Sequence, residues 1–118
     1  MNPAGLVATL AQGRRLLAEA EAEHARLAAF ERELTRQAKE ALAAKDRATA
    51  GERVLELKKV QKALEESART VARLRDTCER AESALGPRER LRLLAARGLL
   101  TPEELVRAEK KLDEEMRA

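Results

Sequence analysis

The chain has almost no aromatic residues and few of the residue types that build metal or disulfide sites. Its 118 residues include one phenylalanine, no tryptophan, no tyrosine, one histidine and one cysteine. A single cysteine excludes an intrachain disulfide, and one cysteine with one histidine is too few for a usual transition-metal site. Without tryptophan or tyrosine, stacking platforms for single-stranded nucleic acid are disfavoured. We therefore expect no metal, no cofactor and no nucleic-acid partner.

The sequence also lacks the patterns of common catalytic sites. Its five glycines are separated from one another, so there is no glycine-rich phosphate loop. His24 and Cys78 could form a nucleophilic pair, but both fall on helical seams, where a buried cysteine commonly acts as a small hydrophobic residue. Glu65-Glu66 is typical of a solvated helix surface, and Glu103-Glu104 of a helix N-terminus. We expect no catalytic residues and no enzyme activity.

Charge is spread evenly along the chain, although the net charge is +3. Residues 1–47, 48–85 and 86–118 each hold 8 basic and 7 acidic residues. Such a mixture is typical of solvated helix faces with i,i+4 pairs. No apolar run approaches the roughly 20 residues of a membrane span, and no basic region precedes the short apolar stretch at the start. We expect a cytoplasmic location, with a peripheral position at a membrane as the alternative.

The residues that are present favour long helices. Charged residues make up 38% of the chain and hydrophobic residues 44%, mostly alanine and leucine, the bias of coiled coils. Asn2 and Pro3 are typical of a helix start. A seven-residue repeat follows and forms one packed face, made of Leu6, Leu10, Gly13, Leu17, Ala20, His24, Leu27, Leu34 and Ala41. Glu31 occupies a position where the repeat calls for an apolar residue, and from Leu27 onward we expect Phe30 to join the face. The period of the apolar repeat should therefore drift from 3.5 toward 3.6 residues.

A second repeat is out of phase with the first and predicts a second helix. Its packing seam consists of Leu57, Val60, Leu64, Val71, Leu74, Cys78 and Leu85. Because the two repeats cannot form one unbroken seam, we expect a turn near residues 45–51, where Asp46, Thr49 and Gly51 are weak helix breakers. The sequence thus predicts a long antiparallel, coiled-coil-like hairpin over residues 1–85. The alternative is one continuous helical rod bent at Gly51.

The C-terminal residues 87–118 predict a separate module of two short helices. Gly86-Pro87 should end the second long helix, with Gly86 in a left-handed conformation. Leu91 and Leu94 share a helical face, and Gly98 is a further stop signal. Thr101, Pro102 and Glu104 then match an N-cap, a first helical proline and a capping box. Leu105, Ala108, Leu112 and Met116 give the last helix an apolar stripe, so we expect the module to dock or to pair.

One set of basic residues suggests an anionic surface as partner. It lies largely on the face of the second helix opposite its seam, and comprises Lys58, Lys59, Lys62, Arg69, Arg73 and Arg80. Asp76 and Glu66 interrupt it. Such a stripe suits an anionic lipid surface better than nucleic acid, because lipid binding requires no base readout.

Residues 31–74 resemble the core helical hairpin of the ESCRT-III and phage-shock-protein-A superfamily. The resemblance rests on the Ala/Lys-rich end of the first helix (Ala38 to Ala44), the charged turn (Lys45 to Gly51), and Leu57-Lys58-Lys59 with Leu64 at the start of the second. It implies a polymerising scaffold whose basic face meets anionic lipid.

Residues 88–116 resemble a SHOCT (short C-terminal) domain. The matching residues are Leu91, Leu94, Gly98, Leu99, Leu100, Thr101, Glu103 and Glu104, with Leu105 in place of the usual aromatic. This resemblance implies a role in association. From the residues and both resemblances we expect a non-enzymatic helical scaffold or adaptor that acts by self-association or by packing against a partner helix. The alternative is an assembly protein at a membrane surface.

Overall fold

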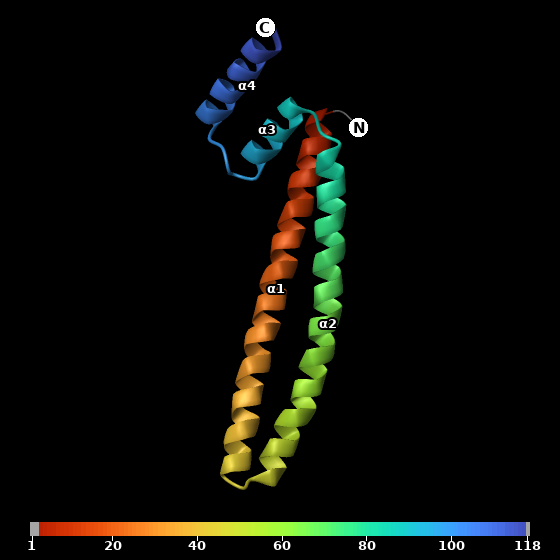
Figure 1. Cartoon of the computed structure of the whole chain (residues 1–118), viewed down its shortest axis with the longest axis vertical. Helices are drawn as coiled ribbons and strands as arrows, with labels where there is room; N and C mark the ends of the chain where they lie inside the picture. Colours follow the sequence, from red (N-terminus) through yellow and green to blue (C-terminus); the bar gives the residue numbers. More distant parts are fainter. Residues whose placement is uncertain (1–2, 118) are drawn as a thin grey trace. The chain divides into compact units, whose positions relative to one another are not determined.

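The computed structural model describes residues 3–117. The regular structure of this part of the chain is helical throughout, with α1 (Pro3–Ala43), α2 (Arg47–Ser83), α3 (Pro87–Ala96) and α4 (Pro102–Arg117) in chain order (Figure 1). The predicted all-α class, an antiparallel hairpin of two long helices followed by two short ones, is confirmed. Asn2, the predicted N-cap, lies outside the described residues.

A turn over residues 44–46 joins α1 to α2 and reverses the chain. The N–H of Asp46 donates to the carbonyl of Ala41 at 2.8 Å and that of Lys45 to Leu42 at 3.0 Å, the two bonds of a Schellman motif. Lys45 adopts the left-handed conformation with a φ of 61°. Asp46 then caps α2, because its Oδ1 accepts a hydrogen bond from the N–H of Thr49 at 3.1 Å. The alternative of a continuous rod is therefore wrong.

Two glycines have roles other than those predicted. Gly51 lies inside α2, so the turn overlaps the predicted segment only at Lys45 and Asp46. Gly86 is the N-cap of α3, with an extended backbone (φ −73°), and α2 has already ended at Ser83. Three residues separate α2 from α3, and the chain leaves the helical path at the first of them. A left-handed glycine at position 86 is therefore not needed to end α2.

The chain divides into two compact units, which cut across the predicted domains. The tip unit is Ala18–Arg73 and contains the turn, while the end unit combines Met1–Leu17 with Leu74–Ala118. The predicted boundary between residues 85 and 87 does fall in the loop between α2 and α3. However, the two short helices belong to the same unit as the adjoining parts of α1 and α2, because α3 shares a hydrophobic cluster with them.

In the tip unit, the buried residues keep the seven-residue repeat. They are Leu34, Ala38 and Ala41 on α1 with Ala50 and Val60 on α2. Leu34 is the most completely buried, with only 2% of its surface exposed. Phe30 is exposed and Glu31 half-buried, so the predicted drift toward 3.6 residues is wrong. The glutamate keeps the seam position because its long side chain can pack its methylene groups there and still reach water.

In the end unit, α3 closes a small core formed by both long helices. Val7, Leu10 and Ala11 of α1, Leu85 after α2, and Leu93 of α3 form one buried cluster, against which Leu6 and Ala81 pack. The cluster explains why a ten-residue helix, too short to be stable alone, is held in place. Leu93 was absent from the face predicted from Leu91 and Leu94, both of which are only half-buried.

The ends of α3 and α4 follow the predicted local chemistry. Gly98 is left-handed (φ 78°), and the N–H groups of Gly98 and Leu99 donate to Ala95 and Leu94 in a second Schellman motif. Thr101 and Glu104 exchange two 3.1 Å hydrogen bonds as a capping box. Both predicted signals are confirmed.

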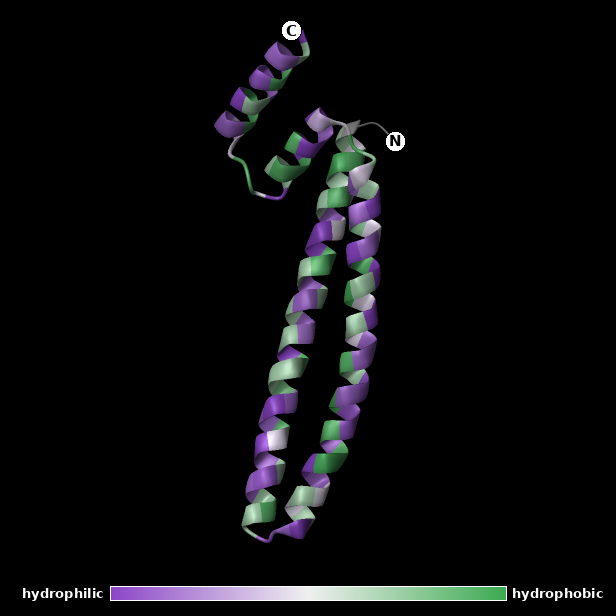
Figure 2. Ribbon diagram, viewed as in Figure 1, coloured by the Kyte–Doolittle hydropathy of each residue, from purple (hydrophilic) through white to green (hydrophobic). Residues whose placement is uncertain are grey.

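Helix α4 packs along α3 without burying any residue. Ion pairs join Arg88 to Asp113 and Arg92 to Glu109. A hydrophobic stripe follows one side of α4, and its other side is hydrophilic (Figure 2). Leu105, Ala108 and Leu112 of the predicted stripe are half-buried, whereas Met116 is exposed, because α4 extends beyond the ten residues of α3 that could cover it.

The two left-handed residues give opposite predictions for stability. Lys45→Gly should raise the free energy of unfolding by about 1 kcal/mol, since glycine adopts this conformation without steric cost. Gly98→Ala should lower it by about 1 kcal/mol for the same reason. Urea denaturation followed by circular dichroism measures both. A destabilised Lys45→Gly variant would contradict the assigned turn.

Candidate interaction surfaces

The predicted seam of α2 faces α1 in each unit. In the tip unit, Val60 is buried and Leu57, Leu64 and Val71 are half-buried. In the end unit, Cys78 and Leu85 are buried and Leu74 is half-buried. Three of the seven seam residues are thus buried within one chain, and the other four are half-buried.

The two residues considered as a nucleophilic pair have separate partners. His24 lies in the tip unit, where its Nδ1 is 3.2 Å from the Oγ of Ser67 across the seam. Cys78 lies in the end unit against Gly13, close enough that a Cβ at position 13 would sit 3.5 Å from its Sγ. Gly13 thus gives the buried thiol its space in the narrow seam.

A partly buried ion pair connects α1 and α2 in the end unit. Arg14 grips the carboxylate of Glu82 with two hydrogen bonds, one of them 2.7 Å from Nε to Oε1. About a fifth of each side chain is exposed. The hydrogen bonds from Arg14, helped by the charges of Arg14 and Arg97, hold the pKa of Glu82 below its ordinary value. Glu82 is therefore a fixed, neutralised anion at the edge of the adjoining groove.

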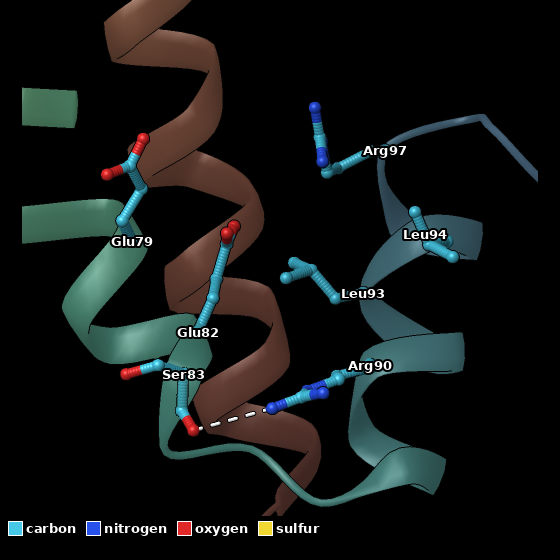
Figure 3. Close-up of a pocket in the computed structure, with 7 residues that line it drawn as sticks. All are labelled: Glu79, Glu82, Ser83, Arg90, Leu93, Leu94 and Arg97. Carbon is cyan, nitrogen blue, oxygen red and sulfur yellow. Dashed lines mark hydrogen bonds between the residues drawn. The ribbon is translucent and has the colours of Figure 1, made fainter. Parts of the chain in front are cut away.

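This groove, called here the end groove, lies between the end of α2 and α3. It has a volume of about 380 Å³ and is lined by Glu79, Glu82, Ser83, Arg90, Leu93, Leu94 and Arg97. Figure 3 shows Leu93 and Leu94 between Arg90 and Arg97 on the α3 side, with the carboxylates and Ser83 on the α2 side. Arg90 also donates to the carbonyl of Ser83 at 3.4 Å.

The charges around the end groove are divided between its two sides. Glu82 is paired with Arg14 and is also influenced by the charge of Arg97, and Glu79 is a second carboxylate on the α2 side. The groove therefore offers apolar side chains with two arginines on the α3 side and two carboxylates on the α2 side. Such a surface suits an apolar side chain beside a carboxylate and a base.

The side of α4 away from α3 presents a complementary pattern. Val106 has 67% of its surface exposed, and Glu103, its i−3 neighbour on the helix surface, lies between it and Arg107. These three residues, called here the α4 outer face, form with Pro102 the lining of a shallow surface hollow. An apolar side chain beside an acid and a base is thus held on a helix that buries nothing in its own chain.

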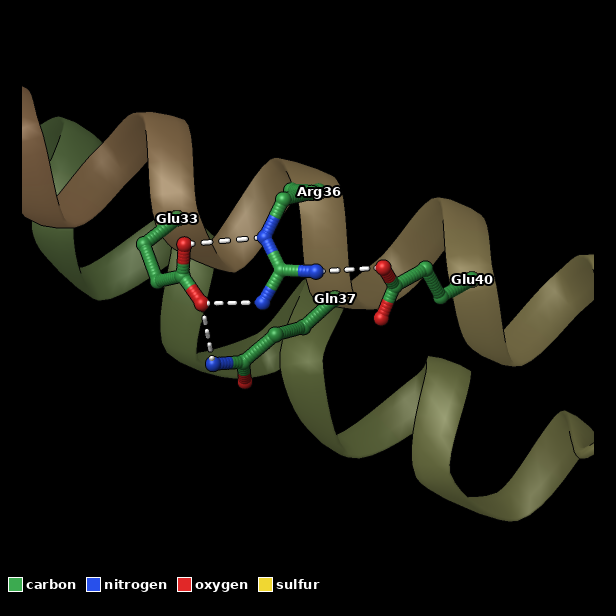
Figure 4. A network of polar contacts seen from close by, with 4 residues as sticks. All are labelled: Glu33, Arg36, Gln37 and Glu40. Carbon is green, nitrogen blue, oxygen red and sulfur yellow. Dashed lines mark hydrogen bonds and ion pairs between the residues drawn. The ribbon is translucent and has the colours of Figure 1, made fainter.

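The residues predicted to meet an anionic surface are all exposed. In the tip unit they are Lys58, Lys59, Lys62, Arg69 and Arg73; in the end unit, Arg80 is paired with Asp76 at 3.1 Å. On α1 the charged residues pair with one another instead. Glu33, Arg36, Gln37 and Glu40 form one network, in which hydrogen bonds from Arg36 and Gln37 lower the pKa of Glu33 to about 2 (Figure 4).

Residues 3–117 contain neither a cluster of metal-ligating side chains nor a helix that could span a membrane. Nowhere in this range do three His, Cys, Asp or Glu side chains come together as metal ligands would. None of the helices described is both long and apolar enough to cross a membrane.

Comparison of the chain with protein-family models, with curated proteins and with solved structures gives no match.

Proposed function

We propose that the chain is a non-enzymatic helical scaffold that self-associates through its end unit. The end groove of one copy takes the α4 outer face of the next copy. The observation that carries this proposal is the end groove itself, in which the half-buried Leu94 and the edge of the buried Leu93 lie between two arginines.

The charges of the two surfaces complement each other. Val106 enters over the apolar side chains, Glu103 meets Arg97 or Arg90 on the α3 side, and Arg107 meets Glu79 on the α2 side. Glu103 and Arg107 are four residues apart, so they are neighbours on the helix surface, with Val106 beside Glu103. Removing these charges from water costs desolvation energy, so a contact that leaves one of them unpaired is strongly disfavoured.

The seam between α1 and α2 supports the choice of these surfaces. Both long helices bury their apolar stripes against each other, so a second copy gains nothing by opening the hairpin. The exposed Val106 of α4 and the half-buried Leu94 of the groove are, by contrast, available without any change in fold. The sequence-based expectation of self-association is retained, but its site moves from the seam to the end unit.

The proposed contact joins two different surfaces, so it is heterologous. After one contact, one copy keeps a free α4 outer face and the other keeps a free end groove, so association continues until a ring closes or a filament grows. A scaffold that grows in this way gives a mass that rises steadily with protein concentration.

The mass of the full chain, measured by sedimentation equilibrium over a concentration series, tests the proposal. The wild type should exceed the monomer mass at high concentration, while Arg97→Glu and Glu103→Arg should each remain monomeric because like charges then face each other. Glu115→Lys, an exposed charge reversal on another face of α4, should associate like the wild type. A wild type that stays monomeric throughout would overturn the proposal.

A further inference from the structure

The tip unit carries a second surface of interest. It lies on one flank of the helical pair and is basic and partly apolar. When two helices pack antiparallel, a residue that comes directly after a second seam residue of the heptad (position e) lies beside the seam. The e positions of both helices are on the same flank of the pair. Leu42 follows the buried Ala41 on α1, and Val54 follows Arg53, a half-buried seam position of α2. Leu42 has 60% and Val54 40% of its surface exposed. The two apolar side chains therefore sit side by side next to the seam.

The same heptad register places basic residues beside these two side chains. The surface, called here the tip face, comprises Arg32, Thr35, Lys39 and Leu42 of α1 with Val54, Lys58 and Gln61 of α2. Thr35 donates its hydroxyl to the carbonyl of Glu31 at 2.8 Å, so it presents its methyl group. All three basic residues of the tip face are exposed.

Four carboxylates of this region are on the opposite flank, while Glu31 occupies the seam. By the same register, Glu33, Glu40, Glu52 and Glu56 fall on the other side of the seam. Three of them are paired, Glu33 and Glu40 with Arg36 and Glu56 with Arg53. The even charge along the chain thus conceals an uneven charge around the hairpin.

We propose that the tip face binds an amphipathic helix of a partner protein that carries acidic residues along the edges of its apolar stripe. Leu42 and Val54 lie beside the seam, where a third helix added to a helical pair packs its apolar stripe. Lys39 and Lys58 stand at the rims, where they meet carboxylates that flank such a stripe. Arg32 extends this rim along α1.

The geometry favours a helix over a lipid surface. A bilayer lying against a helix meets its outermost positions, and on α2 these are Leu55, Lys62 and Arg69. The apolar pair Leu42 and Val54 is set back toward the seam, where a helix can reach both residues together. The tip face shares no residue with the end groove.

The experiment uses the full chain and two designed monomeric helical peptides with the same leucine stripe, flanked by glutamate in one and by lysine in the other. Titration calorimetry should show binding of the glutamate peptide and at least about tenfold weaker binding of the lysine peptide. Lys39→Glu with Lys58→Glu should reverse this preference. Lys110→Glu with Lys111→Glu, the same change on α4, should leave it unaltered.

The apolar contacts have a matched control on the same helix. Leu42→Ser and Val54→Ser should each weaken binding of the glutamate peptide by about tenfold, a change of about 1.4 kcal/mol. Leu55→Ser, at an outermost position and 62% exposed, should have no effect. The proposal is overturned if neither peptide binds, if charge reversal leaves the preference unchanged, or if the chain instead binds anionic vesicles in a manner that depends on Leu55.

Discussion

Leu34→Asp is expected to lower the free energy of unfolding by about 4 kcal/mol or more, because it places an unpaired carboxylate at the most buried position of the seam. Leu34 is 2% exposed and lies between the two long helices. The aspartate side chain is too short to carry its charge to water. A lysine at Leu64, which is only half-buried, could extend its ammonium group to solvent and would be a milder test of the seam.

Leu42→Asp is the control, since it makes the same change eight residues further along α1 at an exposed position. It should cost no more than about 1 kcal/mol, chiefly from a negative charge near a helix C-terminus. Urea unfolding of both variants, followed by circular dichroism, gives the comparison. Equal losses at the two positions would show that Leu34 is not in a packed seam.

Leu93→Ala should destabilise the end unit by about 3 kcal/mol, the usual cost of a buried leucine whose cavity does not collapse. Leu93 is 4% exposed and is the one buried residue of α3. Its loss removes the side chain that joins α3 to Val7, Leu10 and Leu85. Amide hydrogen exchange should then be faster in α3 than in the wild type, because the helix is too short to persist undocked.

The neighbouring Leu94 provides the comparison for this prediction. Leu94 is half-buried and lines the end groove, so Leu94→Ala should cost roughly 1 kcal/mol and leave exchange in α3 nearly unchanged. If Leu94→Ala were the more damaging substitution, α3 would be docked by a different face, and the groove described here would not exist.

Local features of the fold were predictable because their chemistry is local. The capping box of Thr101 and Glu104 and the left-handed Gly98 need only neighbouring residues, and both were recognised in the sequence. The turn between the long helices was placed only approximately. Its left-handed residue is Lys45, a type with no preference for that conformation, and the real signal was the spacing of Asp46 and Thr49.

Features that depend on docking were not predictable in the same way. Three leucines crowd the short α3, and which of them is buried depends on where the long helices end. The pair Arg14 and Glu82 is separated by 68 positions, so no local pattern signals it. Antiparallel pairing of the two repeats could have suggested it, since Gly13 lies opposite Cys78.

The segregation of charge at the tip shows the same limit. Basic and acidic residues are balanced in every third of the sequence. Only when both helices are placed in one register do Lys39 and Lys58 fall on the flank opposite Glu40 and Glu56. Counting charge along the sequence could not reveal a difference between the two sides of a folded pair.

The most direct test of the scaffold proposal is the mass of an equimolar mixture of the Arg97→Glu and Glu103→Arg variants. In each variant alone, the residues at positions 97 and 103 carry like charges and repel each other across the contact. In the mixture, a contact between the two different variants always brings opposite charges together at these positions. We expect the mixture to reach the mass of the wild type at the same total concentration, as measured by sedimentation equilibrium. A mixture that remains monomeric while the wild type associates would contradict the pairing of the end groove with the α4 outer face.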